Sequence, residues 1–131
     1  MTGRAISVVY LFAQACGVLL WWCVLWKWPT SRALFKADAA PDSTLLAFCL
    51  PDVVILVAGS CASAFAISLR KDWALPALYA LAGAAIYAAL YSWGLTIATG
   101  GDGLLGALLM SPLLVATLMI ALGCNQPSTS P

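Results

Sequence analysis

Asp52 is the residue whose type and position could most directly support chemistry. It follows Pro51 and precedes the apolar run 53–57. An ionisable side chain inside a membrane-spanning segment is costly, so a carboxylate in such a place is a candidate for binding a ligand or a proton. The simpler alternative is a carboxylate at a helix boundary, where it caps the helix or pairs with Arg32 or Lys36. Sequence alone leaves both interpretations open.

Arg32 and Lys36 lie in the polar stretch 27–44, ahead of Asp52 in the chain. Cations near a carboxylate could hold the headgroup of an amphipathic molecule, with Asp52 as its proton acceptor or anionic anchor. Asp102 could contribute at the same membrane interface. We therefore predict ligand-binding roles for Asp52, Arg32 and Lys36.

Tyrosines recur at helical spacing along the third apolar segment. Tyr79, Gly83, Tyr87 and Tyr91 are four residues apart, which places them on one slowly drifting helix face. Tyr87 and Tyr91, together with Trp93, could line a cleft of lipid or quinone size. The pattern is also typical of ordinary helix packing through small residues, which we favour.

Gln14 is the strongly polar residue in the middle of the first apolar segment. An amide at that depth either contacts a substrate or joins neighbouring helices by hydrogen bonds worth about 1 kcal/mol. We favour the second role and keep Gln14 as a candidate ligand contact. A neutral amide does not support coupling to protons at this position.

Four tryptophans lie near the end of the first apolar segment: Trp21, Trp22, Trp26 and Trp28. Tryptophan prefers the headgroup level of a bilayer, because its ring is apolar and its N–H seeks a polar partner. We interpret the cluster as an interfacial belt and not as a cage around a ligand.

The remaining composition excludes several classes of function. The chain has no histidine, and its five cysteines form no CxxC pair. It also lacks a phosphate-binding glycine loop and a nucleophile elbow. We predict no catalytic residue, no metal ligand and no cofactor. A net charge of +1 with 8% charged residues argues against a nucleic-acid binder.

The elements that must position these residues are membrane helices. Of the 131 residues, 63% are hydrophobic and only 8% are charged. A soluble domain carries about 25% charged residues. The eleven charges separate four apolar stretches, each near the roughly 20 residues that cross a bilayer. We predict one all-α integral membrane domain over residues 1–131, an antiparallel bundle of four transmembrane helices. The expected helices are about 5–26, 45–69, 73–98 and 103–123, followed by a disordered tail, 124–131.

Two boundaries stay open. The second helix either starts at Pro51, with Asp52 in its first turn, or starts at Ser43, with Pro51 causing a kink. The first segment could be a cleaved signal peptide, but its apolar run is too long for one, so we expect a retained helix.

Orientation in the membrane is nearly balanced. Four helices place both termini on one side, with Arg4, Arg70 and Lys71; three cations also fall on the other side. The positive-inside rule therefore decides little. We favour cytoplasmic termini because Arg70 and Lys71 form a compact pair.

Three short patterns carry a resemblance. They are Trp28-Pro29-xx-Arg32-xx-Phe35, Leu46-Ala47-Phe48-xx-Pro51-Asp52, and Gly59-Ser60. Together they resemble a membrane region found in some bacterial proteins near isoprenylcysteine methyltransferase-like domains. The resemblance implies a membrane partner or accessory bundle in the bacterial inner membrane. That family's cofactor-binding motifs, with histidine and charged residues near the C-terminus, have no counterpart here, so methyl transfer is not implied.

These observations predict a small multi-pass membrane protein that acts as a non-catalytic accessory or interaction subunit. Its expected partners are the lipid bilayer and either further copies of itself or a larger membrane protein. The alternative is a membrane enzyme or carrier that binds an amphipathic, lipid-like molecule at the interface near Asp52.

Overall fold

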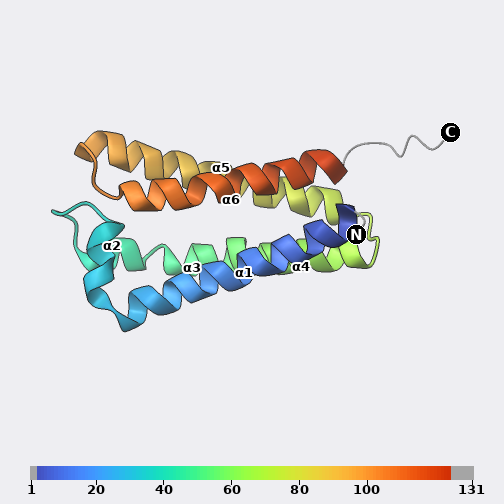
Figure 1. Ribbon diagram of the computed structural model, residues 1–131, viewed down its shortest axis with the longest axis horizontal. Helices are drawn as coiled ribbons and strands as arrows, with labels where there is room; N and C mark the ends of the chain where they lie inside the picture. Colours follow the sequence, from blue (N-terminus) through green and yellow to red (C-terminus); the bar gives the residue numbers. More distant parts are fainter. Residues whose placement is uncertain (1–2, 125–131) are drawn as a thin grey trace.

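The computed structural model describes residues 3–124, and within them it contains four helical regions long and apolar enough to cross a membrane (Figure 1). Their lengths are 25, 27, 26 and 21 residues. The predicted helical class is confirmed, and three of the four predicted helices match their observed bounds to within about two residues. The regions are α1 (Gly3–Lys27), Asp42–Ser68, α5 (Ala74–Thr99) and α6 (Leu104–Cys124). Cys124 thus belongs to α6, and the rest of the predicted tail lies outside the described residues.

The second helical region is interrupted. It consists of α2 (Asp42–Leu46), α3 (Cys49–Pro51), the π-helical segment η2 (Asp52–Val57) and α4 (Ala58–Ser68). Of the two predicted starts, Ser43 is close to the observed one and Pro51 is wrong. Proline has no backbone N–H to donate and its ring crowds the preceding turn, so a regular α-helix does not continue through Pro51. The wider π turn that follows is a form often found at functional sites.

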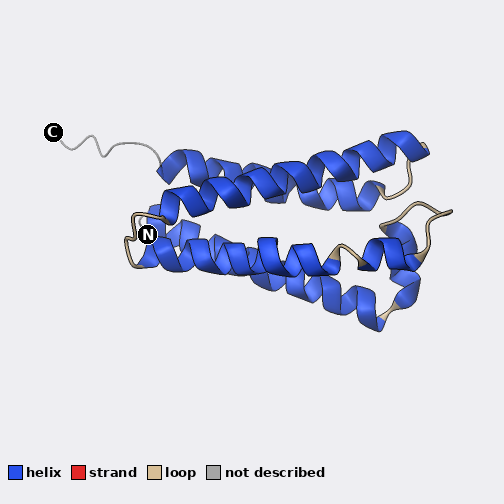
Figure 2. Cartoon of the chain, turned by 180° about the vertical axis from the view of Figure 1, so that it is seen from behind, coloured by secondary structure: helices blue, strands red, loops and turns tan. Residues whose placement is uncertain are grey.

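The helices associate as two pairs, visible in Figures 1 and 2. One pair is α1 with α4 and η2, and the other is α5 with α6. The pairs meet mainly through α4 and α5, whereas α1 touches α6 only sparsely. The start of α1 and the end of α6 lie at the same end of the molecule, where Gly3 and Cys124 line a common hollow.

Small side chains at the helix contacts allow the helix backbones to approach one another closely. The fully or almost fully buried positions include Ser60, Ser63, Ala64, Ala82, Ala85, Ala107 and Ala121. At Gly59 an added Cβ would lie 3.3 Å from Leu81 Cδ1, so α4 and α5 approach closely there. In membranes, such contacts replace the hydrophobic driving force that packs soluble helices. Large apolar side chains point outward instead, among them Leu20, Leu90 and Met119.

The segment after α1 folds back onto the bundle. It contains the short helix η1 (Pro29–Leu34), and Leu34 is exposed as a lipid-facing side chain would be. The next residue, Phe35, turns inward instead. Its ring packs edge-on against Trp21 at a centroid distance of 5.4 Å. The aromatic contact buries apolar surface and fixes the loop over the end of the helices.

Candidate binding site

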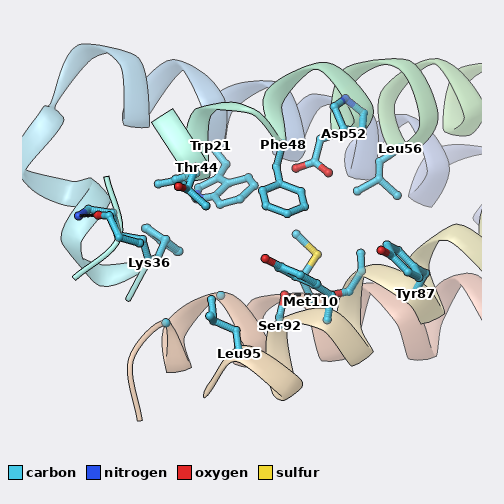
Figure 3. A pocket seen from close by; sticks show the side chains of 18 of the residues that line it. Trp21, Lys36, Thr44, Phe48, Asp52, Leu56, Tyr87, Ser92, Leu95 and Met110 are labelled. Atoms are coloured by element: carbon cyan, nitrogen blue, oxygen red, sulfur yellow. Dashed lines mark hydrogen bonds between the residues drawn. The ribbon is translucent and has the colours of Figure 1, made fainter. Parts of the chain in front are cut away.

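A cavity of about 450 Å³ lies between the two helix pairs, near the end that carries η1 (Figure 3). Its walls come from α1, the loop after η1, α2, η2, α5 and α6. Most of the lining is apolar or aromatic, including Trp21, Phe48, Leu56 and Met110. Among residues 3–124, Asp52 is the only acidic side chain in the lining. A cavity of this size and character is typical of sites for small apolar or amphipathic ligands.

Asp52 is held in the cavity wall by an indole. Trp22 Nε1 donates a hydrogen bond to Asp52 Oδ2 at 3.1 Å, and Trp22 itself is only 3% exposed. The other carboxylate oxygen, Oδ1, has no hydrogen-bond partner within residues 3–124. An ion pair of Asp52 with Arg32 or Lys36, one of the alternatives left open by the sequence, is absent within residues 3–124. The acid is held by a neutral donor, and its carboxylate lies in the wall of the cavity.

Arg32 and Lys36 converge on a different acid, Asp42. Arg32 Nη1 lies 3.0 Å from Asp42 Oδ2, and Lys36 Nζ lies 3.6 Å from Asp42 Oδ1. Arg32 Nε also donates to the carbonyl of Leu25, at the end of α1, over 2.9 Å. Arg32 therefore ties the loop to the helices and does not line the cavity. Lys36 does line it, while donating to the carbonyl of Ala40.

Tyr87 and Tyr91 both line the cavity from α5. Tyr91 stacks at a tilt against Phe48, with ring centroids 5.0 Å apart. Tyr87 is 70% exposed, so the cavity is open to the outside of the bundle at that point. Trp93, predicted beside them, lies elsewhere: its Nε1 donates to Ser111 Oγ at 3.0 Å and joins α5 to α6.

Gln14 and Asp102 lie outside the lining. The Gln14 amide donates to Ser60 Oγ at 3.1 Å and accepts from Thr117 Oγ1 at 3.0 Å, which links α1, α4 and α6. This is the helix-joining role favoured from sequence. Asp102 Oδ2 accepts from the backbone N–H of Asp38 at 3.0 Å and anchors the loop.

Sequence reasoning missed the aromatic side chains that build the site. Trp22 is buried, and Trp21 lines the cavity with its indole N–H buried and without a partner among the described residues. The interfacial-belt interpretation is therefore wrong for this pair, while Trp26 and Trp28 are exposed at 59% and 52%. The available signal was spacing, because Val18, Trp22 and Leu25 share one helix face.

Fold and site together define a class: an all-helical chain whose four long apolar helices are compatible with a multi-pass membrane protein, with one carboxylate set in an apolar cavity. Comparison with family models, with curated proteins and with solved structures finds no match to this chain. The resemblance noted from the short sequence patterns stays a prediction.

Proposed function

We propose that this chain crosses a membrane four times as an antiparallel bundle and binds an amphipathic, lipid-like molecule in the cavity at Asp52. The length and composition of the four helices support the membrane part of the proposal. Large apolar side chains on the outer faces, such as Leu20 and Met119, are suited to contact with lipid tails.

One observation carries the binding part: a carboxylate, oriented by Trp22, stands in a mostly apolar wall. The walls favour a hydrocarbon chain. The Asp52 carboxylate favours a hydroxyl or ammonium donor on that chain, because a hydrogen bond to a charged acceptor is stronger than one to a neutral acceptor. Asp52 acts here as an acceptor that anchors a ligand, and no catalytic step is assigned to it.

Exposure supports an entry route from the surrounding lipid. Tyr87 and Ile55 both line the cavity, and they are 70% and 46% exposed. Lys36 lies at the loop end of the cavity, where a polar headgroup would reach it. An occupant would thus place its polar group between Asp52 and Lys36 and its chain towards Leu56.

The test uses a bromine-tagged long-chain alcohol, since bromine quenches the fluorescence of the nearby Trp21 and Trp22. We expect saturable quenching in the wild-type protein in mild detergent. Asp52→Asn should weaken binding about tenfold, because the hydrogen bond to a charged acceptor is lost. The corresponding methyl ether, which has no O–H to donate, should bind the wild type more weakly and be insensitive to Asp52→Asn.

Two substitutions that enlarge a side chain distinguish binding in the cavity from nonspecific partitioning of the alcohol into detergent. Ala88 lines the cavity and Ala62 lies exposed on α4. Ala88→Phe should abolish the quenching by filling the cavity, and Ala62→Phe should leave it intact. Equal quenching in wild type, Ala88→Phe and Asp52→Asn would show that the alcohol only partitions into detergent and would overturn the proposal.

The second candidate function is the accessory or interaction subunit in a bacterial inner membrane. It is favoured by the exposed face of α5, where Ala80 and Gly83 present little side chain to the surroundings. Small residues on an outer face permit close approach of another helix. Purification in mild detergent should then recover a stoichiometric protein partner that Gly83→Leu removes, while Ala88→Phe has no effect on recovery.

A further inference from the structure

The end of the molecule opposite the Asp52 cavity carries a second hollow, of about 640 Å³. It is formed by the start of α1, the turn between α4 and α5, and the end of α6. Within residues 3–124 no residue lines both hollows, so a ligand here is independent of the one proposed at Asp52, while it rests on the proposed membrane crossing.

Three cations meet at this hollow. Arg4, Arg70 and Lys71 line it together with a single acid, Asp72. Within residues 3–124 none of these three cations lies in an ion pair, whereas at the other end Arg32 and Lys36 both pair with Asp42. The hollow therefore presents an excess of positive charge that the described part of the protein does not neutralise.

Backbone geometry brings these cations together. The Arg4 side chain reaches from α1 to the last turn of α4, where it donates to the carbonyls of Ile67 and Ser68. Arg70 lies just after α4 in the left-handed conformation, with φ of 52°. The amide of Lys71 then bonds back to the carbonyl of Ala66 at 3.0 Å, which closes the turn.

Most of the remaining lining of the hollow is apolar. Leu75 and Leu78 of α5 and Met119 and Ile120 of α6 form its wall, and Met119 is 68% exposed. A cationic rim above an apolar wall is complementary to a molecule with an anionic head and a hydrocarbon chain. A soluble anion would gain nothing from the wall, and a zwitterionic lipid would gain less from the rim.

We propose that this hollow binds an anionic phospholipid, with its phosphate at Arg4, Arg70 and Lys71 and an acyl chain along Leu75 and Met119. Basic residues near the membrane surface each contribute about 1 kcal/mol to attraction of anionic lipid, which corresponds to about a fivefold change in affinity.

The experiment is native mass spectrometry of the full chain in neutral detergent, with added dioleoyl-phosphatidylglycerol or dioleoyl-phosphatidylcholine. We expect the wild type to bind phosphatidylglycerol more tightly than phosphatidylcholine. Arg70→Gln with Lys71→Gln should weaken it by about 25-fold and leave phosphatidylcholine unchanged. Equal affinity of wild type and double variant for phosphatidylglycerol would overturn the proposal.

Two variants that each remove one positive charge, at opposite ends of the molecule, test where phosphatidylglycerol binds. Lys71→Gln should weaken phosphatidylglycerol binding about fivefold, while Lys27→Gln, which removes an exposed cation at the other end, should not. Both sites are exposed, so this pair remains informative if the double variant does not fold. Equal losses in the two single variants would indicate only a general charge effect and contradict the site.

Inorganic phosphate distinguishes a lipid from a free anion. At equal concentration it should not displace phosphatidylglycerol from the wild type, because it makes no contact with the apolar wall. Displacement by inorganic phosphate that depends on Arg70 and Lys71 would assign the hollow to a free anion and overturn the lipid proposal.

Discussion

At the scale of single residues, the contact between Trp22 and Asp52 governs the candidate site. The indole donor is buried at 3% exposure and comes from α1, while the carboxylate is on η2. The bond therefore joins two helical segments and holds the Asp52 carboxylate in the cavity wall. Its loss should affect both stability and ligand affinity.

Trp22→Phe should destabilise the protein by about 2 kcal/mol, because Asp52 loses its donor and the smaller ring leaves a void. Thermal unfolding in detergent measures the change. Combining it with Asp52→Leu isolates the hydrogen bond, with an expected coupling of about 1 kcal/mol. Trp26→Phe, at a position 59% exposed, should cost no more than about 0.5 kcal/mol. A coupling near zero would mean that Trp22 acts through packing alone.

The sequence predicted which residues are unusual better than it predicted their partners. Asp52 stands out because it interrupts an apolar segment, and Gln14 because an amide lies in mid-helix. Each makes a specific side-chain hydrogen bond to another helix, partly buried for Asp52 and buried for Gln14. The donor to Asp52 lies 30 residues earlier in the chain. Pairings of that kind depend on how α1 packs against η2, which no local pattern encodes. Formal charge pointed to Arg32 and Lys36, whereas Asp42 at the loop end satisfies them.

At the scale of elements, helix lengths follow directly from hydropathy, and interruptions do not. The charges that end each apolar stretch predict the helix bounds because ionised groups avoid hydrocarbon. The second helical region is broken at Ala47–Phe48 and turns π-helical after Pro51. In the sequence, only the proline indicates these interruptions. A π turn shifts the angular position of the residues on either side of it, which is why helical periodicity could not predict that Asp52 faces the cavity.

Two helices are followed by a residue in the left-handed conformation, and substitutions at these two residues should change the stability of the protein in opposite directions. Arg70 has φ of 52° and Gly100 has φ of 74°. Arg70→Gly should stabilise the protein by about 0.5–1 kcal/mol and Gly100→Ala should destabilise it by about 1 kcal/mol, because a Cβ is disfavoured in this conformation. Thermal unfolding in neutral detergent without anionic lipid measures both, since Arg70 is also a proposed phosphate contact.

Gly94 provides the control for these changes. It lies inside α5, and an added Cβ there would meet nothing within 4 Å. Gly94→Ala should therefore stabilise by up to about 1 kcal/mol, the ordinary helical preference for alanine. Destabilisation by Arg70→Gly would show that the turn depends on the arginine side chain and not on the backbone conformation.

At the scale of the whole molecule, the two ends differ in how their charges are satisfied. The end with Gly3 and Cys124 carries Arg4, Arg70 and Lys71 against the single acid Asp72. At the other end Asp42 binds both Arg32 and Lys36. The unpaired cations favour the cytoplasmic leaflet, which is rich in anionic lipid. Counting cations in the sequence gave a tie, because counting does not reveal which of them are already paired.

This asymmetry yields a topology prediction. With the other cysteines replaced by alanine, Cys124 and an introduced Ala39→Cys mark the two ends, and both positions are exposed. In intact cells, a membrane-impermeant thiol reagent should label Ala39→Cys at once and Cys124 only after permeabilisation. The reverse pattern would keep the four crossings and invert the orientation. Labelling of both sites before permeabilisation would contradict the membrane-spanning bundle, since the two ends would then share one side. The labelling is all-or-none because the bilayer core, about 30 Å thick, separates the two ends and the reagent does not cross it.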